Sequence, residues 1–202
     1  MPYDLLIKDV RICDGTGGLI RPGAIAIENG SIAAVGEVTG PARREINGGG
    51  LIAAPGFIDI HTHYDAQVSW DRLLTCSSWH GVTSVLMGNC GVGVAPVRPR
   101  SKSTMAWDLV NVEALPHEVL MNGVSWEWES FPQYMDAVAR NGVALNVGFL
   151  VPLSALRFYV IGDQAAERAA TADEIVQMAA LFRDAMLAGA YGFSLSLAPQ
   201  HI

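Results

Sequence analysis

The sequence has 202 residues, half of them apolar and 16% charged, which is ample for a buried core and argues against a disordered chain. With 13 basic and 20 acidic residues the formal net charge is −7, and the arginines are scattered, so the chain lacks the basic surface that nucleic-acid binding needs. The longest apolar runs fall short of the ~20 residues of a membrane span, and no secretory signal pattern opens the chain. We therefore expect a cytoplasmic protein that binds neither nucleic acid nor membrane.

The first part of the chain is typical of a small β domain. Short apolar runs at 3–10, 24–27 and 31–35 predict strands, and turn-forming residues separate them. Asn29-Gly30 between two of these runs favours a two-residue hairpin, since both central positions of that turn require positive φ. The composition changes near Pro55, so we predict a sandwich-like β domain, or the N-terminal part of one, over residues 1–54.

The rest of the chain alternates between strands and helices. Nearly continuous apolar runs predict strands at 57–60, 82–87, 144–150 and 191–195, and residues 131–140 favour a helix. The clearest helix begins at Thr171, where Glu174 completes a capping box, and ends at Gly189. This order predicts an α/β fold with a parallel sheet covered by helices. Residues 98–129 are interpreted as a long irregular connection that could cover a site.

Four strand-helix units are half of what a TIM-type (β/α)8 barrel contains, since that fold has eight units in about 250 residues. We therefore expect residues 55–202 to form the first half of such a barrel. Because half a barrel leaves strand edges uncovered, we expect the chain to need a missing C-terminal half or to self-associate.

Two histidines follow the first strand of this region. His61 and His63 are two residues apart, so in extended backbone both point to the same side, at the carboxyl end of the strand where barrel enzymes collect their functional groups. Imidazole is a good ligand for zinc. Such a pair is often a surface accident, but the preceding strand favours a metal site here.

Cys90 follows the next strand, between Gly88 and Gly91. It would lie beside the two imidazoles, and its thiolate could join two metal ions. The alternative is an inert packing cysteine in a tight turn. Only three cysteines are present, too few and too odd a number for a disulfide scaffold. No lysine lies on the four predicted barrel strands, so a lysine cannot act as the bridging ligand there.

The sequence at this point resembles the N-terminal part of an N-acyl-D-amino-acid deacylase (D-aminoacylase) of the amidohydrolase superfamily. The resemblance covers essentially the whole chain. It rests on residues 55–63, on residues 77–83, and above all on the narrower Gly-Asn-Cys-Gly motif at 88–91. Residues 155–157 and 189–194 support it.

The resemblance implies zinc-dependent hydrolysis of the amide bond of N-acyl-D-amino acids, which are small molecules, to a D-amino acid and a carboxylate. It assigns metal binding to His61, His63 and Cys90. It also implies that the further metal-binding histidines and the general-base aspartate lie beyond Ile202, so this chain alone is expected to bind zinc weakly and turn over little. Two alternatives stay open: a cyclic-amide hydrolase related to dihydroorotase or hydantoinase, and a truncated half barrel without catalytic activity.

The remaining polar candidates are weaker. Asp65 could accept a hydrogen bond from a ligand histidine, although a solvated loop carboxylate is the more common situation for such a residue. His80 is interpreted as a core or hydrogen-bonding residue, with a position lining the pocket as the alternative, and His117 as solvent-exposed or structural. His201 is left unassigned.

Overall fold

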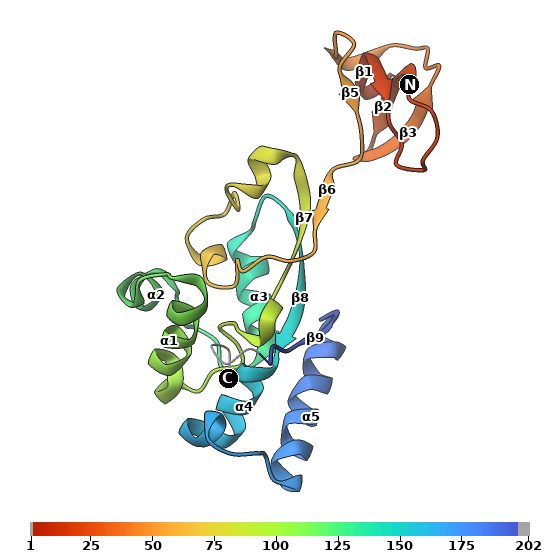
Figure 1. Ribbon diagram of the computed structural model, residues 1–202. Helices are drawn as coiled ribbons and strands as arrows, with labels where there is room; N and C mark the ends of the chain where they lie inside the picture. Colours follow the sequence, from red (N-terminus) through yellow and green to blue (C-terminus); the bar gives the residue numbers. More distant parts are fainter. Residues whose placement is uncertain (1, 198–202) are drawn as a thin grey trace. The chain divides into compact units, whose positions relative to one another are not determined.

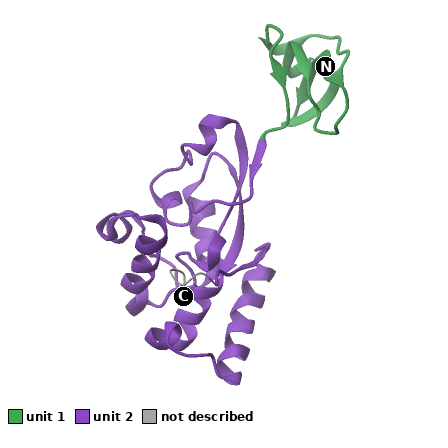
Figure 2. Ribbon diagram, viewed as in Figure 1, with its two compact units in different colours: residues 1–56 green, residues 57–202 purple. Residues whose placement is uncertain are grey.

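A computed structural model describes residues 2–197 of the chain. The chain forms two compact units, residues 1–56 and residues 57–202 (Figure 2). The division falls close to Pro55, where the composition of the sequence changes.

The N-terminal unit is a five-stranded mixed sheet. Its strands are β1 (Tyr3–Ile12), β2 (Arg21–Glu28), β3 (Ser31–Gly36), β4 (Ala42–Asn47) and β5 (Ile52–Ala53). The order is β3-β2-β1-β4, and β5 also pairs with β1. A sandwich requires two facing sheets, whereas the described part of this unit contributes one.

The β2–β3 hairpin forms as its turn residues predict. Asn29 and Gly30 have φ of 51° and 74°, and Glu28 pairs with Ser31 across the turn. Antiparallel strands twist in the sense that this turn provides, so the two residues set the register of the hairpin. The small core behind the sheet centres on Leu6, which packs with buried alanines of β2.

The second unit contains a four-stranded parallel sheet, and it confirms the predicted α/β half barrel. The strands are β6 (Phe57–Asp59), β7 (Val82–Met87), β8 (Asn146–Pro152) and β9 (Gly192–Ser194). They pair in sequence order and all run parallel (Figure 1). Parallel strands in sequence order bring every strand's carboxyl end to one edge of the sheet.

Five α-helices accompany the described sheet. They are α1 (Lys102–Glu113), α2 (His117–Gly123), α3 (Phe131–Asn141), α4 (Leu153–Ile161) and α5 (Ala172–Leu187). Single turns of 3₁₀ helix lie at η1 (Gln67–Ser69), η2 (Ser77–His80), η3 (Asn89–Gly91), η4 (Pro99–Ser101) and η5 (Gly162–Ala166).

The prediction of an irregular connection over residues 98–129 is wrong, because α1 and α2 lie within it. Neither helix carries a side-chain cap at its N-terminus, and the apolar residues of α1 do not gather into one stripe. The two signals that mark a helix in a sequence are therefore absent there.

The core of the second unit lies between the sheet and the helices. Met87 of β7 and Phe149 of β8 are buried on the same side of the sheet as Tyr134 of α3. The rings of Tyr134 and Phe149 meet edge to face with centroids 5.8 Å apart, a favoured aromatic geometry. The Tyr134 hydroxyl also donates a hydrogen bond of 2.9 Å to the backbone oxygen of Asp65, so α3 holds the chain just after β6.

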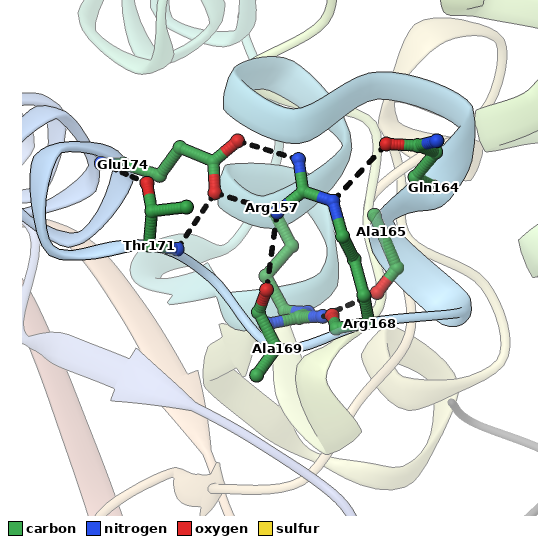
Figure 3. A network of polar contacts seen from close by, with 7 residues as sticks. All are labelled: Arg157, Gln164, Ala165, Arg168, Ala169, Thr171 and Glu174. Carbon is green, nitrogen blue, oxygen red and sulfur yellow. Dashed lines mark hydrogen bonds and ion pairs between the residues drawn. The ribbon is translucent and has the colours of Figure 1, made fainter.

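A polar network fixes the entry to α5 (Figure 3). Thr171 and Glu174 form the predicted capping box, in which the Thr171 hydroxyl accepts from the Glu174 amide and the Glu174 carboxylate accepts from the Thr171 amide. Arg168 donates two hydrogen bonds to the same carboxylate, at 2.7 and 2.8 Å, and these bonds hold the pKa of Glu174 at about 2. The guanidinium of Arg157 donates to the backbone oxygens of Ala165 and Arg168, which closes the turn before α5.

Large apolar side chains remain exposed on three parts of this unit. They lie on and beside β6 (Phe57, Ile58, Ile60), on and beside β9 (Tyr191, Phe193) and on α5 (Ile175, Val176, Leu187). In the described sheet β6 and β9 are the two edge strands. The uncovered apolar surface thus coincides with the ends of the half barrel and with its last helix.

The helices of residues 2–197 include none that is both long and apolar enough to cross a membrane.

The cap of α5 gives a stability prediction. We expect Thr171→Ala to lower the free energy of unfolding by about 1 kcal/mol, because the Glu174 amide loses its acceptor. Thr171→Ser keeps the hydroxyl and serves as the control, with most of the stability retained. Urea unfolding followed by circular dichroism measures both, and an alanine variant as stable as the parent would contradict the role of the cap.

Candidate metal centre

His61 and His63 are brought to one side by the residue between them. The amide and the hydroxyl of Thr62 both donate to the backbone oxygen of Leu86 in β7, at 3.1 and 2.9 Å. Thr62 is buried, so its side chain faces the sheet. In extended backbone its two neighbours must then point the other way. Their imidazole rings have centroids 5.4 Å apart.

Cys90 lies in a tight turn that directly follows β7. Its φ of 56° falls in the left-handed region, which is costly for a residue with a side chain and persists only where the surroundings enforce it. The flanking glycines are required by packing as well as by their positive φ. A Cβ at Gly88 would collide with the backbone oxygen of Leu150, and one at Gly91 would lie 3.1 Å from Cα of Leu195.

Side chains from three other segments hold the backbone of this turn. Asp65, after β6, accepts a hydrogen bond of 3.1 Å from the Gly88 amide. Ser194 of β9 accepts from the Gly91 amide at 2.9 Å and donates to the Gly88 oxygen. Ser154, at the start of α4, donates to the Gly91 oxygen. The position of the Cys90 side chain is therefore set by residues distant from it in sequence.

Asn89 ties the turn to the histidine segment. Its buried amide group donates to the backbone oxygens of Thr62 and Leu86, at 3.2 and 3.0 Å. Leu86 is the same residue whose oxygen accepts from Thr62. The histidine segment and the cysteine turn are thus linked through one point of β7.

The three predicted ligand residues lie together. Nε2 of His61 is 3.2 Å from Sγ of Cys90, and one ligand atom from each of His61, His63 and Cys90 lies within 4.8 Å of the others. Ligand atoms of a tetrahedral zinc ion are about 3.4–3.6 Å apart for Zn–N and Zn–S bonds of roughly 2.0–2.3 Å. The limit of 4.8 Å exceeds this ligand-to-ligand distance by little more than about 1 Å. A small side-chain rotation therefore fits the three ligand atoms to one ion. Two imidazoles and a thiol suit a borderline-soft cation.

The electrostatics around the thiol also suit a cation. Burial, and then the negative charge of Glu113, raise the pKa of the Cys90 thiol. Without a compensating charge the thiol is held protonated, whereas a bound cation would favour the thiolate.

Asp65 is buried, so its interpretation as a solvated loop carboxylate is wrong. Burial raises the pKa of Asp65 to about 7, against the opposite effect of the hydrogen bond from Gly88. The sequence could not show this burial, because the residues that cover Asp65, such as Tyr134, come from distant parts of the chain.

Glu113 was not found by sequence reasoning. Its Oε1 lies 3.3 Å from Nδ1 of His63, and both side chains are partly buried. It is the last residue of α1, a helix that the sequence pattern did not predict.

The other histidines lie outside this cluster. The ring of His80 bonds the backbone oxygen of Cys76 at 2.8 Å, which confirms a hydrogen-bonding role. His117 stacks on Trp107 with centroids 4.6 Å apart and contacts the Ser103 hydroxyl, as a structural residue does. His201 lies outside the described residues.

A cavity of about 600 Å³ adjoins the cysteine turn at Gly91. Its wall contains aromatic, aliphatic and polar side chains, among them Trp107, Asp108, Leu153, Ser154, Arg157, Phe158 and Leu195. Arg157 donates to backbone oxygens, and Arg168, which also lines the cavity, pairs with Glu174. Both guanidinium groups thus have structural partners.

Two characterised relatives match nearly the whole chain. D-aminoacylase of Alcaligenes xylosoxydans xylosoxydans is 34% identical over 194 residues, which are 96% of this chain and 37% of that protein. N-acyl-D-glutamate deacylase of the same organism is 34% identical over 198 residues, 98% of this chain and 38% of that protein. The chain therefore spans well under half the length of these relatives.

Solved structures of the same two kinds of enzyme also match nearly the whole chain. A crystal structure of D-aminoacylase superposes with a TM-score of 0.82 at 34% identity, covering 99% of this chain and 40% of that one. N-acyl-D-glutamate deacylase from Bordetella bronchiseptica, complexed with zinc and a phosphonate inhibitor that mimics the tetrahedral intermediate of its reaction, superposes with a TM-score of 0.77 at 31% identity, covering 98% of this chain and 39% of that one.

These matches confirm the resemblance on which the sequence interpretation rests. The model of the Amidohydrolase family matches residues 44–202, which is most of the sequence. The chain belongs to the amidohydrolase family.

Proposed function

We propose that this chain supplies part of the active site of a zinc-dependent hydrolase that cleaves the amide bond of N-acyl-D-amino acids. The observation that carries the proposal is the convergence of His61, His63 and Cys90 within 4.8 Å at the carboxyl ends of two neighbouring parallel strands. The names of the relatives, a D-aminoacylase and N-acyl-D-amino-acid deacylases, support the substrate class.

In this proposal His61, His63 and Cys90 hold the metal. A bound zinc ion supplies a Lewis acid, which polarises the amide carbonyl and makes a water molecule acidic enough to react near neutral pH. The two imidazoles contribute neutral nitrogen ligands, and the thiolate contributes the negative charge that a divalent cation compensates. The turn around Cys90 keeps the sulfur in place, so binding requires little rearrangement.

Asp65 is proposed as a positioning residue rather than an acid–base group. Its carboxylate is buried and accepts from the Gly88 amide, so it joins the segment that carries His63 to the turn that carries Cys90. A further hydrogen bond from a ligand histidine to Asp65 belongs to the same proposal. The general base is expected beyond Ile202, as the family resemblance implies.

The cavity beside Gly91 offers room for the substrate. Its volume of about 600 Å³ is within the range of small-molecule sites. Trp107 and Phe158 give it apolar walls, which would exclude water from part of an acyl amino acid.

The exposed apolar surfaces of β6, β9 and α5 are proposed to be covered by further strand-helix units of the same barrel. A parallel sheet of this kind is normally buried on both faces. Phe57 and Phe193, on the two edge strands of the described sheet, are more than half exposed, which is typical of an unfinished core rather than of an outer surface.

Metal binding gives the first test. We expect the 202-residue chain to bind Co²⁺ with a thiolate-to-metal absorption band in the near ultraviolet, because Cys90 is a ligand. Cys90→Ser should abolish the band and weaken binding by roughly tenfold or more. Cys76→Ser removes an exposed thiol outside the cluster and is the matched control. An unchanged band in Cys90→Ser would refute the site.

Substrate class gives the second test. The protein as its own gene encodes it, loaded with zinc, should release amine from N-acetyl-D-amino acids and not from the L enantiomers. The 202-residue chain alone should release little, because the general base contributes a factor of about 10² to 10⁴. Opening of hydantoin or dihydroorotate without cleavage of acyl-D-amino acids would favour the cyclic-amide alternative.

The uncovered surfaces give the third test. The 202-residue chain should self-associate with rising concentration in size-exclusion chromatography, because exposed apolar surface on α5 seeks a partner. Val176→Glu should shift the chain toward the monomer, whereas the neighbouring Gln177→Glu adds the same charge at an exposed polar position and should not. A monomer at all concentrations with cooperative unfolding would show that four strands suffice.

A further inference from the structure

Glu113 occupies a position that its own helix disfavours. It is the last residue of α1, where the helix dipole places partial negative charge and where a basic residue is favoured. The helix has no basic residue in its last turn to compensate. A local arrangement that costs stability is often retained because the residue serves a site.

The side chain of Glu113 faces the proposed metal site. Its Oε1 is 3.3 Å from Nδ1 of His63. Its negative charge also contributes to the raised pKa of Cys90 and of Asp65, so the carboxylate lies within electrostatic reach of both ligand-bearing segments. Glu113 is not one of the three residues whose ligand atoms lie mutually within 4.8 Å, so it stands behind the ligands rather than among them.

A histidine that binds a metal uses one ring nitrogen and commonly donates the proton on the other to a carboxylate. This bond fixes which nitrogen carries the proton, orients the ring and makes the ligand nitrogen more basic. With Glu113 beside Nδ1 of His63, the nitrogen left for a metal is Nε2.

We propose that Glu113 is a positioning residue for the metal site: its carboxylate accepts the Nδ1 proton of His63 and so holds the ring with Nε2 directed to the ion. This inference rests on the proposed function, because it presupposes a metal at His61, His63 and Cys90. The 3.3 Å separation is at the long end for such a bond, so the proposal requires a small adjustment of the two side chains toward each other.

Cobalt titration of the full 202-residue chain tests the proposal. Glu113→Ala removes the acceptor and should weaken Co²⁺ binding by about 10- to 100-fold. Glu113→Gln keeps an amide oxygen that can accept from Nδ1 but lacks the charge, so its affinity should fall between those of alanine and the parent. At saturation, both variants should show the same cobalt spectrum as the parent, because the ligands themselves are unchanged.

Glu118→Ala is the control, since it removes an exposed glutamate from the adjacent helix α2. Unfolding midpoints without metal separate loss of fold from loss of positioning, and the proposal expects them to change far less than the affinity. If Glu113→Ala does not fold, the graded comparison of the parent with Glu113→Gln carries the test.

Three results would be decisive against the proposal or its basis. If both Glu113 variants bind Co²⁺ as tightly as the parent, Glu113 does not position His63, and their contact is only an ion pair. A saturated cobalt spectrum altered in the visible bands would make Glu113 a ligand. Failure of the parent chain to give a Cys90-dependent cobalt band would instead refute the proposed metal site itself.

Discussion

The position of Cys90 beside the two histidines depends on one tight turn, whose backbone amides and carbonyls find hydrogen-bond partners on distant side chains. Residues 88–91 reverse direction with Gly88, Cys90 and Gly91 all at positive φ, and the amides and carbonyls of the two glycines need hydrogen-bond partners like any other backbone groups. Asp65, Ser154 and Ser194 supply the missing partners from three other segments. Unmade, each such bond would cost about 1–3 kcal/mol in a buried setting. The conformation that directs the Cys90 sulfur toward His61 is therefore a property of the assembled sheet and not of the motif alone.

Several acidic groups lie close together around the histidine segment and the cysteine turn. Asp65 is buried and its pKa is raised, the Cys90 thiol is held protonated, and Glu113 adds a negative charge nearby. Burial of like charges is costly in an environment of low dielectric. A divalent cation would reverse the sign of that balance, since the groups that repel one another all attract it. The pattern is costly for a purely structural cluster and favourable for one that binds a metal.

Sequence reasoning reached the parts of this molecule that local patterns determine. His61 and His63 were recognisable because their spacing of two follows an apolar strand, and α5 because Thr171 and Glu174 combine a cap with an apolar stripe. Glu113 was out of reach, since α1 has neither signal and nothing in the sequence ties its end to His63. Asp65 was misread as solvated for the same reason: its burial depends on Tyr134 and on the turn at Gly88, contacts across 69 and 23 residues. A helix without a cap, and a side chain whose environment comes from distant segments, depend on tertiary contacts that local sequence patterns do not show.

The histidine segment and the cysteine turn directly follow two neighbouring strands, β6 and β7, and this determines how much of the site the described residues can organise. Thr62 and Asn89 share the backbone oxygen of Leu86, so the histidines and the cysteine are set relative to each other by the end of β7. Ser194 then makes the geometry of Cys90 depend on β9, the far edge of the described sheet. That edge carries exposed apolar side chains, as does β6 at the other end. An element that pairs with β9 would therefore act on the cysteine turn through Ser194, so the further strand-helix units that we propose would constrain the proposed metal site as well as cover exposed apolar surface.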